Sequence, residues 1–171
     1  TGGADAWNTD NYLNIWVCNL ANDLLGYATF PGDGSPNEQG VVIDFGSLPG
    51  GSLTGFNGGK TLTHELGHYF NLYHPWGTGS DNSDCSGTDL IDDTPVKSGP
   101  TTGCPTGIQT DACSNSSPGI MYQNFMDYSS DNCLVMFTNL QVVRMEATIA
   151  VSRPSLLTSN GCLPLVLPDY D

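Results

Sequence analysis

The stretch HELGHYFNLYH, residues 64–74, decides how the rest of this chain is interpreted. It contains all three histidines of a 171-residue protein. Side chains four residues apart on a helix lie on the same face, so His64 and His68 can share one metal ion. Glu65 follows the first of them, where its carboxylate can take a proton from a water bound to that ion. The pattern HExxH on a helix therefore predicts a zinc site with its general base in place.

His74 can complete this site only if the chain turns back after the helix. It follows His64 by ten residues, too far along a continuous helix to reach the same ion. The reversal needs positive φ, which glycine usually supplies, but Asn71 stands at that position and asparagine also tolerates the left-handed region. An isolated HExxH also occurs by chance among ordinary core or surface histidines. A third histidine at this spacing favours a catalytic zinc site, with three imidazoles and one water.

Length and charge limit the classes of protein that fit. At 171 residues the chain is expected to form one domain, residues 1–171, with a substantial core. Four Lys and Arg residues stand against 18 Asp and Glu, which gives a formal charge of −14. Nucleic acids and anionic membranes attract clustered basic residues, so we predict neither as a partner. Some of the carboxylates are candidates for calcium binding, and most are expected to be simply solvated.

The six cysteines indicate an exported protein. They lie at positions 18, 85, 104, 113, 133 and 162, without a C-x-x-C pair that would suggest structural zinc or redox chemistry. Three disulfides formed in an oxidising compartment are the better interpretation, so we expect secretion. The cysteine count alone leaves the pairing open. No apolar run is long enough to span a bilayer, and Thr1 is expected to be the start of a processed or trimmed chain.

The rest of the chain alternates between short strands and loops. Residues 12–18, 24–30 and 40–45 are predicted strands. A helix is predicted over residues 60–70, with Thr61 or a residue just before it as N-cap and an inward stripe of Leu62, Leu66, Tyr69 and Phe70. Residues 75–130 are rich in Gly, Ser, Thr, Asp and Pro, and need disulfides to order them.

A second helix is predicted over residues 139–150, closed by Pro154. Its apolar spacing places Leu140, Val143, Ala147 and either Ile149 or Ala150 inward.

These motifs resemble the metzincin metalloendopeptidases, in which a methionine turn lies beneath the zinc site. Here HELGH-x-x-N-x-x-H is followed by NFMDY, residues 124–128. Within that clan the chain is most similar to the pappalysin-like peptidases, of the ulilysin and cytophagalysin type. The similarity extends over residues 1–146, through segments 12–19, 24–27, 93–95 and 137–141. The zinc motif and the methionine turn are its specific parts.

The resemblance implies a role for each matching residue. The three histidines bind zinc, and Glu65 acts first as general base and then as general acid. Met126 forms the apolar floor under the imidazoles, which is physically close to an ordinary core methionine. Tyr128 helps to stabilise the tetrahedral intermediate, since a phenol can donate to an oxyanion; the alternative is a buried structural tyrosine.

The resemblance also implies a calcium site and a disulfide pattern. Asp89 and Thr94 would bind calcium with backbone carbonyls, which suits a hard cation, although an ordinary acidic loop is the alternative. The implied pairs are Cys85–Cys113 and Cys104–Cys133, which leaves Cys18–Cys162.

The resulting fold class is α+β, with a metzincin-like arrangement. Residues 1–74 are expected to form an upper subdomain, with a twisted mixed sheet, an edge strand over the cleft and the active-site helix. Residues 75–171 form an irregular, disulfide-stapled lower subdomain with the methionine turn and a C-terminal helix. Relatives carry a strand and a backing helix upstream of the segment that starts here, so these elements are expected to be missing, cleaved away or differently arranged.

The predicted activity is hydrolysis of internal peptide bonds by a secreted zinc endopeptidase, monomeric and made as a zymogen. The partner is an extended polypeptide that adds to the strand 24–30 by main-chain hydrogen bonds. Residues 129–133 would shape the pocket beyond the cleaved bond, where Asp131 would favour a basic side chain. The alternatives are a non-catalytic binding module, which would usually have lost Glu65 or a histidine, and an exopeptidase or amidase, which the open groove does not favour.

Overall fold

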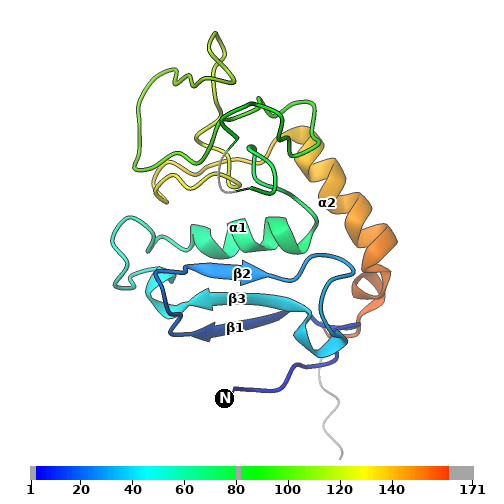
Figure 1. Ribbon diagram of the computed structural model, residues 1–171. Helices are drawn as coiled ribbons and strands as arrows, with labels where there is room; N and C mark the ends of the chain where they lie inside the picture. Colours follow the sequence, from blue (N-terminus) through cyan, green and yellow to red (C-terminus); the bar gives the residue numbers. More distant parts are fainter. Residues whose placement is uncertain (1–2, 80–81, 162–171) are drawn as a thin grey trace, which may run out of the picture.

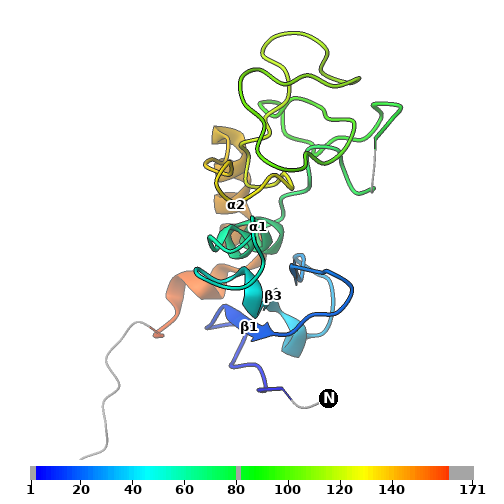
Figure 2. The ribbon, with the colours of Figure 1, turned by 90° about the vertical axis from the view of Figure 1, so that its left-hand side faces the viewer.

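The computed structural model describes residues 3–79 and 82–161. Its helix α1 (Lys60–Tyr69) lies between a small sheet and a large set of loops (Figures 1 and 2). The other elements in chain order are β1 (Asn14–Cys18), β2 (Gly26–Ala28), η1 (Pro36–Glu38), β3 (Gly40–Asp44), η2 (Phe45–Ser47), α2 (Asn139–Ser152) and η3 (Pro154–Thr158). This mixture of strands and helices confirms the predicted α+β class.

The three strands form a mixed sheet in the order β1-β3-β2. Strand β1 pairs parallel with β3, and β2 pairs antiparallel with it. All three strands lie inside their predicted ranges and are one to four residues shorter. Strand β2 is the edge strand next to α1 (Figure 1), as the sequence predicted. The edge of β2 that faces away from β3 is therefore not paired with another strand of this sheet.

Two apolar clusters hold the halves of the molecule to α1. On the sheet side, Val41 and Ile43 of β3 pack with Tyr69, joined by the partly buried Leu62, Leu66 and Phe70. This confirms the predicted inward stripe of the helix. On the loop side, Leu72, Ile91 and Met126 form a second cluster, against which Phe137 and Met145 pack. The helix is thus covered by the core on both sides.

Helix α1 begins at Lys60, as predicted, but Thr61 is not its N-cap. Its N-cap is Gly59, in the left-handed region at φ 83°, with no side-chain cap, and Thr61 lies inside the first turn. Only glycine adopts this conformation at little cost, and the preceding glycine-rich loop supplies it. The Asp131 carboxylate provides what a capping side chain would, because it accepts hydrogen bonds from the backbone N–H groups of Gly58 and Lys60 (2.7 and 3.2 Å).

The predicted inward face of α2 is wrong at Leu140, Val143 and Ala147. Leu140 and Val143 are 41% and 56% exposed, and Ala147 and Ala150 are exposed as well. The buried positions are Gln141 and Thr148, with Ile149 partly buried. Polar contacts of Gln141 explain which side of α2 is buried. Gln141 forms a capping box with Thr138 at the start of the helix, and its side-chain amide forms two hydrogen bonds with the Asn124 amide (2.7 and 3.1 Å). These contacts turn a polar side toward the loops and leave apolar side chains in solvent.

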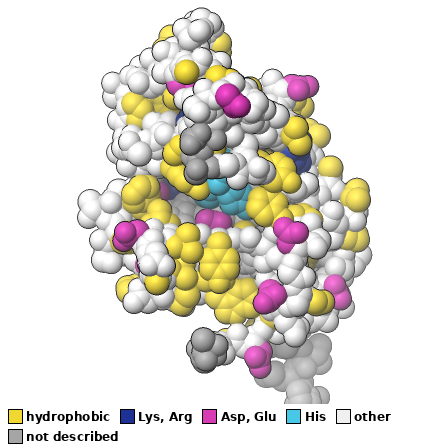
Figure 3. Space-filling model, in the orientation of Figure 1, with side chains coloured by type: hydrophobic (Ala, Val, Ile, Leu, Met, Phe, Trp, Pro, Cys, Tyr) yellow, Lys and Arg dark blue, Asp and Glu magenta, His cyan; other side chains and the backbone are white. Residues whose placement is uncertain are grey.

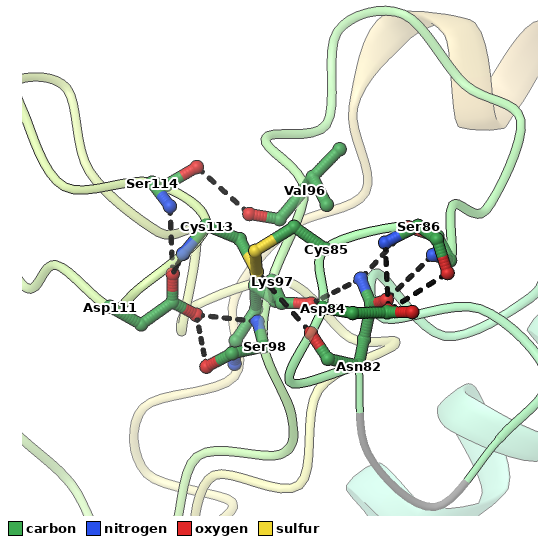
Figure 4. Close-up of a disulfide and its surroundings, with 11 residues drawn as sticks. Asn82, Asp84, Cys85, Ser86, Val96, Lys97, Ser98, Asp111, Cys113 and Ser114 are labelled. Atoms are coloured by element: carbon green, nitrogen blue, oxygen red, sulfur yellow. Dashed lines mark hydrogen bonds between the residues drawn. A yellow bond between two sulfur atoms is a disulfide. The ribbon is translucent and has the colours of Figure 1, made fainter.

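Two disulfides staple the loop half, and both match the pairing that the resemblance implied: Cys85–Cys113 (Figure 4) and Cys104–Cys133. Cys18 is exposed and forms no disulfide within the described residues. Its predicted partner Cys162 lies outside them, so the Cys18–Cys162 pair stays a prediction. Within the described ranges, no helix combines the length and apolar character needed to cross a membrane.

Candidate active site

The two histidines of α1 point to the same place, as their spacing requires. Their Nε2 atoms lie 3.2 Å (His64) and 3.1 Å (His68) from Nε2 of His74. The other ring nitrogen of each is tied to a backbone carbonyl: His64 Nδ1 to Phe125 O and His68 Nδ1 to Leu72 O, both at 2.7 Å. An Nδ1–H that donates to a carbonyl leaves Nε2 with a free lone pair, which is the form that binds a metal.

The turn that brings His74 back is built on Asn71. This residue has φ 71°, so the predicted left-handed asparagine is confirmed. The N–H of Asn71 donates to His68 O, and the N–H of Leu72 donates to Gly67 O (both 2.9 Å). These are the two hydrogen bonds of a Schellman motif, which ends a helix and reverses the chain. Leu72 is fully buried on the far side of the turn, which fixes the path towards His74.

The histidine triad fits a tetrahedral ion. Zinc–nitrogen bonds of about 2.0–2.1 Å in tetrahedral geometry separate the nitrogens by roughly 3.3 Å, close to the two separations of 3.1 and 3.2 Å. Among the described residues, no other group of three or more His, Cys, Asp or Glu side chains could hold one ion. The donor set thus suits zinc on geometry and on ligand type.

Burial keeps the three imidazoles neutral. It lowers the pKa of His64 well below its usual value, with His68 and His74 adding to the effect. Burial also lowers the pKa of His68. For His74, burial and then the neighbouring His68 lower the pKa to about 3. At neutral pH the site therefore offers lone pairs rather than positive charges, as a metal centre requires.

Glu65 is buried beside the triad, and an edge-strand glycine makes room for it. Burial raises the pKa of Glu65 to about 8, so its carboxyl can bind and release a proton near neutral pH. A Cβ on Gly26 of β2 would lie 2.9 Å from the Glu65 Cγ and 2.9 Å from the Val42 carbonyl oxygen. The absence of a side chain at this point of β2 lets the strand pass directly against the candidate base.

Met126 lies under the helix where Gly67 has no side chain. Met126 is fully buried, and a Cβ on Gly67 would lie 2.3 Å from its sulfur. Gly67 stands between the two helical histidines in the sequence, and the thioether packs against α1 at this position. That Met126 forms the floor under the imidazoles themselves stays a prediction.

We expect Gly67→Ala to destabilise the protein. Alanine gains up to about 1 kcal/mol over glycine in a helix, but overpacking a core typically costs about 1–3 kcal/mol. The cost of the clash with Met126 should exceed the gain in helix propensity, and the melting temperature should fall by several degrees. Gly99→Ala is the matched control, because nothing lies within 4 Å of a Cβ there. A Gly67→Ala protein that melts at or above the wild-type temperature would contradict this account of the packing.

Tyr128 stands at the rim of the triad. Its ring centroid lies 4.9 Å from that of His74 and 5.5 Å from that of His64, and 46% of the residue is exposed. Burial of the phenol, and then the carboxylates of Glu65 and Asp127, raise the pKa of Tyr128. The phenol therefore keeps its proton at neutral pH and can donate it in a hydrogen bond. Half exposure next to the triad is unlike a buried structural tyrosine.

Two residues near the triad had no signal in the motif analysis. Trp76 is buried and stacks on His74, with centroids 4.6 Å apart and planes 8° apart. Lys97 is buried as well and forms an ion pair with Asp127. The first could have been suspected because it follows the third histidine by two residues. The second stands in a Pro- and Gly-rich loop that offers no periodicity.

A cavity of about 350 Å³ opens beside the triad, and its lining includes Gly26 of β2, His64, Glu65 and Tyr128. The histidines are visible at the bottom of a hollow between the sheet and the loops (Figure 3). Asp131 lines the same cavity, but one of its oxygens is already used at the start of α1. The site is therefore an open cleft whose walls come from both halves of the molecule.

The predicted calcium residues lie together elsewhere. The Thr94 hydroxyl donates to the Asp89 carboxylate (2.6 Å), and burial raises the pKa of Asp89. The Arg144 guanidinium donates to the backbone carbonyls of Asp89 and Leu90 (2.8 and 2.5 Å). The two oxygens that the resemblance assigns to calcium are thus adjacent and engaged with each other.

Comparisons with known proteins agree with this geometry. A peptidase family model described as pregnancy-associated plasma protein-A matches residues 3–150. An extracellular metalloprotease of Arthroderma gypseum is 38% identical over 167 residues, which is 93% of this chain and 56% of that protein. One of Pyricularia oryzae is 40% identical over 147 residues, 82% of this chain and 49% of that protein. The chain thus spans about half the length of these curated relatives, whose names agree with the predicted extracellular location.

A solved structure shows the same fold. Mature mirolysin of Tannerella forsythia, in complex with a cleaved peptide, superposes with a TM-score of 0.85 at 46% identity. The match covers 91% of this chain and 59% of that one. The family match over most of the chain, the named relatives and this superposition lead to one conclusion: the chain belongs to the pappalysin family of metzincin peptidases.

Proposed function

We propose that this chain is the catalytic region of a secreted zinc endopeptidase. The observation that carries the proposal is the convergence of three neutral imidazoles, with Nε2 of His74 lying 3.2 and 3.1 Å from Nε2 of His64 and of His68, next to a buried glutamate in an open cleft. The names of the relatives support the reaction class. The complex of mirolysin with a cleaved peptide supports a polypeptide in the cleft.

The residues around the triad have complementary tasks in this proposal. Zinc held by the three histidines would polarise the scissile carbonyl and lower the pKa of a bound water. Glu65 takes the proton of that water and returns it to the leaving amine. The Tyr128 phenol donates a hydrogen bond to the oxygen that becomes negative in the tetrahedral intermediate. Met126 and Trp76 keep the imidazoles in place and exclude water from beneath them.

The substrate would lie extended beside β2. That strand pairs with β3 on one edge only, and its first residue, Gly26, lines the cavity next to Glu65 together with the preceding Leu24 and Leu25. Main-chain hydrogen bonds to the other edge would hold a polypeptide of many sequences. We also propose that Asp131, in the cavity lining, favours a basic side chain after the cleaved bond. Peptide libraries cleaved without preference for Arg or Lys at that position would contradict this assignment.

Zinc-dependent hydrolysis is the direct test. Purified protein should contain about one zinc ion per chain and should cleave casein or a quenched fluorescent peptide at internal bonds. Treatment with 1,10-phenanthroline should remove the ion and the activity together, and added zinc should restore both. A protein that binds zinc stoichiometrically yet leaves all such substrates intact would contradict the proposal.

Calcium binding at Asp89 and Thr94 is a further part of the proposal. Its support is the adjacency of the Asp89 carboxylate and the Thr94 hydroxyl. To bind calcium, the Thr94 hydroxyl would have to rotate so that its oxygen faces the ion and it no longer donates to Asp89. We expect about 1 mM calcium to raise the melting temperature of the zinc-loaded protein, because a ligand that binds only the folded state stabilises it. The shift should vanish in Asp89→Asn and persist in Asp5→Asn. An unchanged shift in Asp89→Asn would place the calcium elsewhere.

A further inference from the structure

The only ion pair between side chains in the described part of the chain joins Lys97 to Asp127; Asp127 lines the cleft, and Lys97 lies behind it. Lys97 is 1% exposed, and its ammonium group donates to the Asp127 carboxylate and to the Thr101 hydroxyl (2.6 Å). Burying an ammonium group is costly unless it is paired, and an apolar side chain of similar volume is often no less stable. The pair therefore raises the question of what it does besides stabilising the fold.

The carboxylate that Lys97 holds is fastened beneath Tyr128. Asp127 Oδ1 accepts hydrogen bonds from the backbone N–H groups of Thr101 and Tyr128, both at 2.8 Å. Asp127 Oδ2 accepts from the Thr101 hydroxyl (2.9 Å) and from Lys97. The position of the ammonium group thus fixes the carboxylate, and the carboxylate fixes the backbone from which the Tyr128 phenol projects.

Lys97 also stands behind the aromatic wall of the site. Its Nζ lies 5.4 Å from the centroid of the Trp76 ring, within the range of a cation–π contact. Trp76 stacks on His74, and the Tyr128 ring meets Trp76 edge-on at 5.1 Å and His74 at 4.9 Å. One buried ammonium group thus touches both supports of the tyrosine, its backbone and its neighbouring ring.

The backbone around Lys97 is fixed by the disulfide-stapled loop (Figure 4). The Ser114 hydroxyl donates to Val96 O (2.8 Å), and the Asn82 side chain donates to Lys97 O (2.9 Å). The N–H of Ser98 donates to the Asp111 carboxylate (2.7 Å). Three successive residues are therefore held by segments that Cys85–Cys113 joins. A side chain anchored in this way can transmit a fixed position to its partners.

We propose that Lys97 is a positioning residue for peptide hydrolysis, which acts through Asp127 and Trp76 to hold the Tyr128 phenol at the place of the developing oxyanion. The inference rests on the proposed function, because it gives Tyr128 its task in the same reaction. It assigns no contact between Lys97 and substrate, since Lys97 does not line the cavity. Mutation of a residue that orients a functional side chain typically lowers metal affinity or activity by about 10–100-fold.

A double-mutant cycle tests this coupling. Steady-state kinetics on a fluorescent peptide would compare wild type, Lys97→Met, Tyr128→Phe and the double variant, all zinc-loaded and assayed well below their melting temperatures. Lys97→Met should lower kcat by about 10–100-fold with KM little changed, because the phenol acts in the transition state rather than in the bound substrate. In the Tyr128→Phe background, the same substitution should cost far less.

Two further measurements separate positioning from stability. A phosphinic peptide, which imitates the tetrahedral intermediate, should bind Lys97→Met more weakly by the same factor as the loss of kcat/KM. Arg144→Met removes another loop-anchoring cation, one bonded to the carbonyls of residues 89 and 90; it should lower the melting temperature and leave kcat unchanged. If Lys97→Met does not fold, Lys97→Gln, which retains a donor without charge, enters the same cycle with a smaller expected loss.

Two outcomes would overturn the inference while the proposed function stands. One is a wild-type kcat in the folded Lys97 variant, and the other is an equal loss in both Tyr128 backgrounds. A wild-type protein without zinc-dependent hydrolysis would overturn both the inference and the proposed function.

Discussion

Glu65→Gln is expected to lower the rate of peptide hydrolysis by about 10²–10⁴-fold, the usual contribution of a general acid–base group. Glutamine has the same shape but cannot accept and return a proton. The fold should be preserved, because burial raises the pKa of Glu65 to about 8, which means that a neutral group is already accepted at this position. The zinc content should also be preserved, since the three nitrogens that face one another belong to the histidines.

The measurement is kcat/KM on a fluorescent peptide, with zinc content and melting temperature determined on the same samples. Glu146→Gln is the matched control, because this exposed residue lies on α2 and does not line the cleft; its kinetics should equal those of the wild type. Activity of Glu65→Gln within a few-fold of wild type, at full zinc occupancy, would rule out Glu65 as the base.

His74→Ala is expected to abolish activity by removing the metal. Two imidazoles from α1 would remain, without the third ligand that closes the site. We expect the affinity for zinc to fall by more than about 100-fold, the upper range for loss of a mere supporting residue. The stabilisation that zinc gives to the folded state should disappear with it. The stacking partner of Trp76 would be lost as well, so the metal-free variant should also melt below metal-free wild type.

Competition with a chromogenic chelator measures the zinc affinity, and thermal melts with and without zinc measure the linkage. Asn71→Gly is a useful control, because glycine takes the left-handed turn more readily than asparagine does. This variant also changes a residue between His68 and His74, but it leaves all three ligands in place, so it should retain the zinc affinity of the wild type. Tight zinc binding by His74→Ala would show that His74 is not the third ligand.

The part of the site that sequence analysis could predict is the part governed by local rules. The four-residue spacing of His64 and His68 fixes a shared face on any helix. The left-handed tolerance of Asn71 then fixes the reversal that brings His74 back, and the structure places Asn71 at φ 71°. Both rules depend only on local backbone geometry, so they apply whatever residues pack against this segment.

The part that failed depends on what packs against each element. Hydrophobic spacing chose Leu140 and Val143 as the buried side of α2, but the amide network between Gln141 and Asn124 determines the side that is buried. Lys97 could not be assigned for a related reason. Its partner Asp127 is 30 residues away, and no local pattern marks a lysine that will be buried.

The metal-binding segment is short, whereas the bonds that order the opposite wall are long-range. The three imidazoles come from residues 64–74, and the two disulfides close separations of 28 and 29 residues. Shorter loops close at lower entropic cost. During biosynthesis, ion capture is therefore expected to require no prior oxidation of thiols, while the arrangement around Tyr128 matures only once Cys85–Cys113 has formed. A reduced chain would then bind zinc but hydrolyse peptides slowly, and disulfide formation would be the last step of its assembly.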